Sequence, residues 1–102
     1  MKEKTKMAKK FRLSARINSD DPSSIESILG RLIGGKGRIK SIEKGFEVEA
    51  DLKGESARDL NRMLLSEMSK AEKRTIIRAE WISGNRIKKF FDYVPKGIRK
   101  LN

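Results

Sequence analysis

The sequence contains no cysteine and no histidine. Disulfide bonds, thiolate or imidazole zinc sites, cysteine nucleophiles and histidine general bases are therefore excluded. No apolar run approaches the roughly 20 residues that a membrane-spanning helix needs, and no apolar signal-peptide segment follows the basic start. These absences predict a cytoplasmic protein with no metal, no cofactor and no membrane contact. The chain also lacks a complete catalytic motif, so we expect that it is not an enzyme.

Acidic residues are too few to balance the basic ones, because 25 Lys and Arg face 14 Asp and Glu, a net charge of +11 over 102 residues. The excess lies at the two ends. Residues 1–10 hold five lysines against one glutamate, and residues 84–102 hold six cations against one aspartate. Basic ends on a nearly neutral body favour contact with a polyanion, most often nucleic acid. The abundance of Lys, Arg and Glu is also typical of thermophile proteins.

The length suits one domain with its own hydrophobic core. Residues 1–10 are basic and have no apolar period, which predicts a flexible arm. Residues 11–94 carry all the periodic apolar patterns and are predicted to form a single α+β domain. Pro95 ends the last pattern, and residues 95–102 are predicted to be a basic tail.

The first half of the chain predicts strand, helix and strand. Apolar residues alternate over residues 11–17 and again over residues 46–52, which predicts two strands that each bury one face. Isoleucines and leucines recur every three to four positions over residues 22–33, after the capping pair Asp21 and Pro22, which predicts a helix. The stretch 38–44 fits either a short helix or a strand.

The second half predicts a helix followed by a hairpin. Ser56 is followed three residues later by Asp59, the spacing of a capping box, and the apolar face that follows predicts a helix to about residue 73. β-Branched and aromatic residues fill the stretch 75–82. A turn signal at residues 83–85 separates it from residues 86–94, which predicts a hairpin of two strands.

If residues 38–44 form a strand, the order is β-α-β-β-α-β with an added C-terminal strand. This order predicts a ferredoxin-like two-layer sandwich with both helices on one face of an antiparallel sheet. The first and third strands are then neighbours, so Arg12 and Arg16 should face Glu47, Glu49 and Asp51 across the sheet. The predicted open face carries no aromatic residue, so base stacking on the sheet, as in RRM proteins, is not expected.

The glycine-rich run at residues 32–42, LIGGKGRIKSI, resembles the core of a KH domain. That family uses a basic GxxG loop between two helices to clamp a nucleic-acid backbone. The resemblance covers about residues 29–50 and implies a KH-like fold as the alternative. The same run also fits a glycine helix cap that carries basic residues. If the loop binds nucleic acid, the predicted contact residues are Gly34, Gly35, Lys36, Gly37, Arg38 and Lys40.

The C-terminal segment mixes cations with aromatic residues. Cations follow phosphates while aromatic faces stack on unpaired bases, at roughly 1–3 kcal/mol per stacked base. Alternation cannot bury both Phe90 and Phe91 on one face of a strand, so at least one should lie off the main core. The predicted contact residues here are Arg86, Lys88, Lys89, Phe90, Tyr93, Lys96, Arg99 and Lys100.

Charge, aromatics and the glycine loop together predict a small, basic, non-catalytic protein that binds nucleic acid, RNA rather than DNA, through backbone contacts. The alternative is an interaction subunit of a larger ribonucleoprotein or RNA-modifying complex. In that case the basic ends and exposed aromatics would bind a protein partner. Salt-dependent affinity for RNA distinguishes the two functions, because phosphate contacts release counterions.

Overall fold

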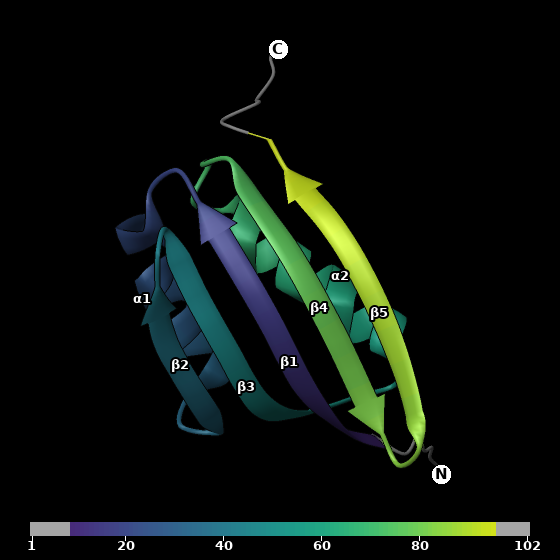
Figure 1. Ribbon diagram of the computed structural model, residues 1–102. Helices are drawn as coiled ribbons and strands as arrows, with labels where there is room; N and C mark the ends of the chain where they lie inside the picture. The colour runs from purple at the N-terminus through teal and green to yellow at the C-terminus, as the bar shows by residue number, and fades with distance from the viewer. Residues whose placement is uncertain (1–8, 96–102) are drawn as a thin grey trace, which may run out of the picture.

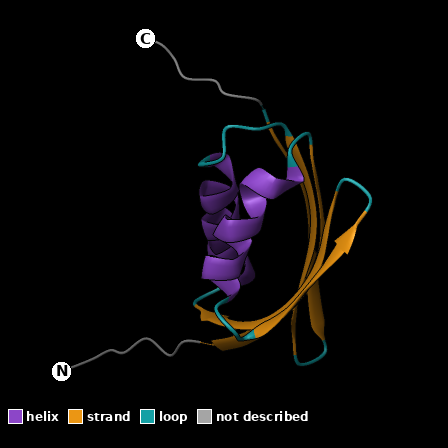
Figure 2. Cartoon of the chain, turned by 90° about the vertical axis from the view of Figure 1, so that its left-hand side faces the viewer, coloured by secondary structure: helices purple, strands orange, loops and turns teal. Residues whose placement is uncertain are grey.

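The computed structural model describes residues 9–95. These residues form a mixed α+β structure of two helices and five strands. The sheet is antiparallel throughout, with strand order β2-β3-β1-β4-β5. Both helices cover the same face of the sheet, and the other face, turned toward the viewer in Figure 1, is open (Figures 1 and 2). The elements in chain order are β1 (Lys9–Ser19), α1 (Pro22–Ile33), β2 (Gly37–Ile42), β3 (Gly45–Gly54), α2 (Ala57–Ser69), β4 (Thr75–Ser83) and β5 (Arg86–Val94).

The stretch that fitted either a helix or a strand is a strand. β2 pairs antiparallel with β3, and its Ile39 lies opposite Val48 on the side of the helices. Arg38 and Lys40 alternate with Ile39 and therefore lie on the open face. The glycine run thus joins a helix to a strand, whereas a KH loop joins two helices.

The core lies between the sheet and the helix layer and follows the apolar alternation of the sequence. In each of the three central strands every second side chain points toward the helices, and these side chains pack against one apolar stripe on each helix. Among residues 9–95, no helix has the length and apolar character needed to cross a membrane. The largest fully buried side chains include Leu13, Ile17, Ile25, Leu29, Leu64, Met68, Ile77 and Trp81.

Helix α1 begins and ends where the sequence predicted. Asp21 is its N-cap residue, but the Asp21 carboxylate accepts hydrogen bonds from the hydroxyls of Ser24 at 2.7 Å and Ser23 at 2.8 Å rather than from a helix amide. These hydrogen bonds, Ser24 first, lower the pKa of Asp21. At the other end Gly34 takes a left-handed φ of 55° and donates its N–H to the Gly30 carbonyl at 2.8 Å.

Helix α2 begins with the predicted cap and ends earlier than predicted. The Ser56 hydroxyl accepts the Asp59 N–H at 3.1 Å. The helix stops at Ser69 rather than near residue 73. The Ser69 hydroxyl donates to carbonyls of the preceding turn, and Glu72 takes a left-handed φ of 56°, which a continuing helix does not allow.

Strand β1 begins two residues earlier than predicted. Lys9 and Lys10 were assigned to the flexible arm because they add no apolar residue to the alternation. In the structure they pair with Gly54 and Lys53 and extend the sheet. The rest of the predicted arm and the predicted tail after Pro95 lie outside the described residues.

Candidate nucleic-acid interface

The open face over β2, β3 and β1 is covered by opposite charges. As predicted, the arginines of β1 face the acids of β3, and an arginine of β2 joins them. Each pair is solvent-exposed and contributes on the order of 0–1 kcal/mol. Because each of these arginines already has an acid, this part of the face offers little free positive charge to a phosphate. The pairs are Arg12–Asp51 at 3.4 Å, Arg16–Glu47 at 3.0 Å and Arg38–Glu49 at 2.9 Å.

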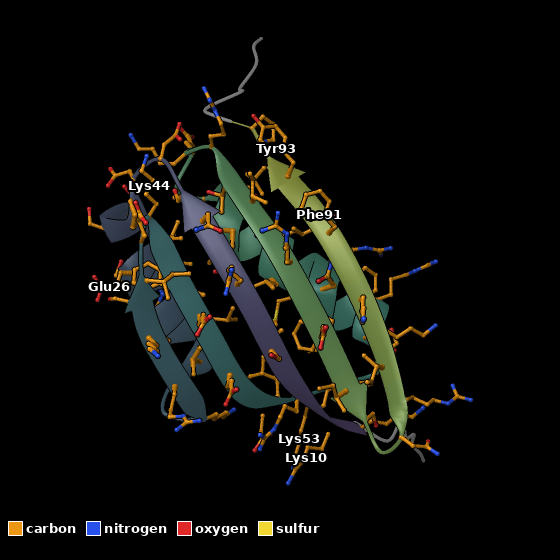
Figure 3. The ribbon with its side chains drawn as sticks, viewed as in Figure 1. Lys10, Glu26, Lys44, Lys53, Phe91 and Tyr93 are labelled. Atoms are coloured by element: carbon orange, nitrogen blue, oxygen red, sulfur yellow. The ribbon has the colours of Figure 1, made fainter. Side chains whose placement is uncertain are left out.

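The prediction that the open face carries no aromatic residue is wrong. Strand β5 extends the sheet beyond β4 and places Phe91 and Tyr93 on this face, with exposed fractions of 66% and 56% (Figure 3). The open face carries no aromatic residue on β1 or β3, and both exposed rings belong to β5, the added strand. The Arg78 guanidinium lies 5.2 Å from the centroid of the Phe91 ring, a cation–π contact.

The two neighbouring phenylalanines take opposite faces, as alternation requires. Phe90 lies opposite Ala79 on the helix side and is half-buried against the core. The ring of Phe90 is therefore not on the open face, and this position does not support its predicted role in base stacking. Phe91, which was not among the predicted contact residues, takes the exposed position instead.

The cations of β5 do not form one patch. Lys88 and Lys89 are adjacent in sequence, so their side chains point to opposite faces. The Lys89 ammonium lies 3.9 Å from the Glu80 carboxylate on the open face, while Lys88 lies on the helix side. Arg86 is exposed at the start of β5, next to the hairpin turn. The predicted contact residues Lys96, Arg99 and Lys100 lie outside the described residues.

A hollow of about 670 Å³ lies on the open face across β3, β1, β4 and β5. Its charged lining is balanced, with three cations and three acids, so it does not favour a polyanion. The charged side chains that line it are Arg16, Arg78, Lys89, Glu47, Glu49 and Glu80.

Backbone conformation and close backbone packing explain why the loop contains three glycines. Gly34 and Gly35 have left-handed φ values of 55° and 85°, which side chains other than glycine rarely adopt. Gly37 has no room for a side chain, because an added Cβ would lie 2.0 Å from the Glu49 carbonyl oxygen. The helix-cap interpretation is confirmed for Gly34, and the loop projects one exposed cation, Lys36.

Lys36 lies close to two other lysines. Its carbonyl accepts the Asp51 N–H at 3.0 Å, which places the loop beside the end of β3. In the same region Lys10 of β1 lies directly opposite Lys53 of β3 (Figure 3). The three lysines, here called the basic corner, line one hollow of about 580 Å³. The apolar wall of this hollow is formed by Leu32, Leu52, Leu60 and Met63.

The basic corner is electrically unbalanced. Of the residues that the structure describes, Asp51 is the one acid that lines this hollow, and the Asp51 carboxylate already pairs with Arg12. Within the part of the chain that the structure describes, none of the three lysines forms an ion pair. Lys10 and Lys53 face one another as like charges on paired strands, which destabilises the sheet unless an anion lies between them.

Lys10 and Lys53 were missed in the sequence, although a signal was present. The predicted pairing of the first and third strands, in the register that places Arg12 opposite Asp51, brings Lys10 opposite Lys53 two residues further along. Lysine ammonium groups bind phosphate as compact point charges, so this corner can hold a polyanion backbone. Comparison of the chain with protein-family models, with curated proteins and with solved structures gave no match.

Proposed function

We propose that the protein is a small, non-catalytic RNA-binding protein whose basic corner binds the phosphate backbone. The observation that carries the proposal is that Lys10, Lys36 and Lys53 line one hollow in which, among residues 9–95, no acid is free to neutralise them. A phosphate between the lysines turns their mutual repulsion into shared attraction. The excess of cations in residues 1–10 and 84–102 adds long-range attraction for the same polyanion.

The apolar wall of the basic corner favours RNA with unpaired nucleotides. Single-stranded RNA has unstacked bases that can turn outward from the strand. Such a base could occupy an apolar hollow while its phosphate contacts the neighbouring lysines. Phe91 and Tyr93 lie on the open face of β5 and offer exposed rings for a further base.

The proposed fold is ferredoxin-like with β5 as an addition. Without β5 the strand order is β2-β3-β1-β4, with α1 after the first strand and α2 after the third. This arrangement supports the proposal, since the two βαβ halves place both helices on one face. The hairpin with β4 then adds β5 at the sheet edge and brings exposed aromatics to the open face.

An interaction subunit of a larger assembly is the second candidate function. The specific observation in its favour is the row of exposed apolar side chains on β5, formed by Ile87, Phe91 and Tyr93. Such a row on an edge strand is typical of surfaces that bind another chain. This function alone predicts no dependence of RNA affinity on the basic corner.

The test is the salt dependence of RNA affinity for the full chain and two triple-alanine variants. The first variant replaces Lys10, Lys36 and Lys53. Each neutralised single-strand phosphate contributes roughly 0.7 to the slope of log affinity against log salt, so the slope should fall by about 2.

The matched control replaces Lys44, Lys70 and Lys73, three lysines near the opposite end of the sheet, and removes the same charge. The Lys44 carbonyl accepts the N–H of Ser19, the last residue of β1, whereas Lys10 lies at the start of β1. We expect the control to keep the slope of the unmodified chain. Equal losses in both variants, or no salt-sensitive RNA affinity in the unmodified chain, would refute the proposed function.

A further inference from the structure

Strand β5 leaves one edge of the sheet open. It pairs with β4 on one side, and no strand of the described chain pairs with its other side. It is nine residues long, whereas β2 at the opposite edge has six. Among residues 9–95, the large apolar side chains that are exposed all belong to β5, namely Ile87, Phe91 and Tyr93. A long edge with apolar side chains is a template for pairing with another strand.

The same strand carries two charges whose partners are absent from the described chain. The half-buried Asp92 carboxylate accepts a hydrogen bond from the Asn61 amide at 3.0 Å, and no cation within residues 9–95 pairs with it. Lys88 lies four residues earlier on the same side of the strand, is exposed and pairs with no acid of this region. Asp92 and Lys88 therefore lie on an unpaired edge with no ion partner in the described chain, and opposite charges on a neighbouring strand can pair with them.

We propose that β5 pairs antiparallel with β5 of a second copy of the chain, centred on Phe90. In this register Lys88 lies opposite the partner's Asp92, and by symmetry Asp92 lies opposite the partner's Lys88. On the open face Ile87 meets the partner's Tyr93, and Lys89 meets the partner's Phe91. Each chain thus gains a partner for Lys88 and a partner for Asp92, and Ile87 and Tyr93 form apolar pairs across the two strands.

Neighbouring registers that keep both helix layers on one side are less favourable. Centring the pair on Lys89 places that lysine opposite its own copy. Centring it on Phe91 places Asp92 opposite the partner's Phe90 and leaves the carboxylate without a cation. The register centred on Phe90 avoids both faults and pairs all nine residues of β5. The two five-stranded sheets then become one continuous sheet with a single open face.

The pairing does not require RNA, so it is tested on the full chain without RNA. We expect sedimentation equilibrium to give twice the chain mass of 11.7 kDa, with dissociation on dilution. Lys88→Glu faces the partner's Asp92 with a like charge and should reduce the mass to that of one chain. Lys44→Glu makes the same charge change on an exposed turn and should keep the doubled mass.

The register is tested by oxidation of single-cysteine variants, since the chain has no cysteine of its own. Phe90→Cys meets its own copy, within the Cα separation of about 4.4–6.8 Å that a disulfide allows. Arg86→Cys, at the end of the strand, would lie about 27 Å from its copy at 3.4 Å per residue. We expect Phe90→Cys to cross-link much faster than Arg86→Cys.

The proposal is overturned by a single-chain mass at every concentration or by a doubled mass that survives Lys88→Glu. Equal cross-linking rates in folded cysteine variants would overturn the register. If circular dichroism shows that Phe90→Cys does not fold, the comparison of Lys88→Glu with Lys44→Glu still decides the proposal.

Discussion

The amide of Asn61 should contribute strongly to stability, because it connects helix α2 to both strands of the β4–β5 hairpin. The Asn61 oxygen accepts the indole N–H of Trp81 at 3.0 Å, and its nitrogen donates to Asp92 at 3.0 Å. Asn61 and Trp81 have exposed fractions of 4% and 1%. Asn61→Ala leaves the indole N–H unpaired in the core, at about 1–3 kcal/mol, and removes a bond to a charged group worth about 1.5–3 kcal/mol. Together the two effects should lower the free energy of unfolding by about 2.5–6 kcal/mol.

Urea unfolding followed by tryptophan fluorescence measures this loss directly, because Trp81 is the one tryptophan of the sequence. Asn18→Ala is the matched control. The Asn18 amide donates to the carbonyls of Glu43 and Lys44 at 3.3 and 3.5 Å near the surface, so its removal should cost less than about 1 kcal/mol. Equal small losses in the two variants would refute the role assigned to Asn61.

Three further outcomes follow from the fold. Gly37→Ala should lower the free energy of unfolding, as urea unfolding would show, because its Cβ would lie 2.0 Å from a carbonyl oxygen of β3. The pKa of the Asp21 carboxyl should lie below its ordinary value of 3.8. The stability that this carboxylate contributes is then complete above pH 3.8 and is lost as the pH falls through the lower pKa of the folded state. NMR titration of the carboxyl measures this pKa, and Ser24→Ala should raise it because the variant removes the first cause of the shift. Phe90→Ala should cost about 2 kcal/mol and Phe91→Ala less than about 1 kcal/mol in the same urea assay, since Phe90 is half-buried and Phe91 is 66% exposed.

The sequence was sufficient to predict those elements in which apolar residues follow one clear period. Alternation predicted β1 and β3, and the pairing of opposite charges correctly placed Arg12 and Arg16 beside the acids of β3. Alternation also separated Phe90 from Phe91 but did not show which one faces the core. That choice depends on the register between β4 and β5, which places Phe90 opposite the buried Ala79 and Asp92 opposite the buried Ile77 on the side of the helices.

The basic corner shows a second limit of prediction from the sequence. Its three lysines come from β1, from the loop after α1 and from the end of β3, so no local motif brings them together. Lys88 and Lys89, by contrast, are adjacent in sequence and were predicted to act together, yet strand geometry sends them to opposite faces. A cluster of charges along the chain is therefore a weaker guide to a binding surface than the register between strands.

The most direct test of the proposed function is an NMR titration of the isotope-labelled full chain with single-stranded RNA at low salt. We expect the largest shift changes at Lys10, Lys36 and Lys53, with smaller changes at Phe91 and Tyr93, and we expect both groups to diminish as salt is added. The absence of any shift, or shifts confined to the opposite end of the sheet, would contradict RNA binding at the basic corner.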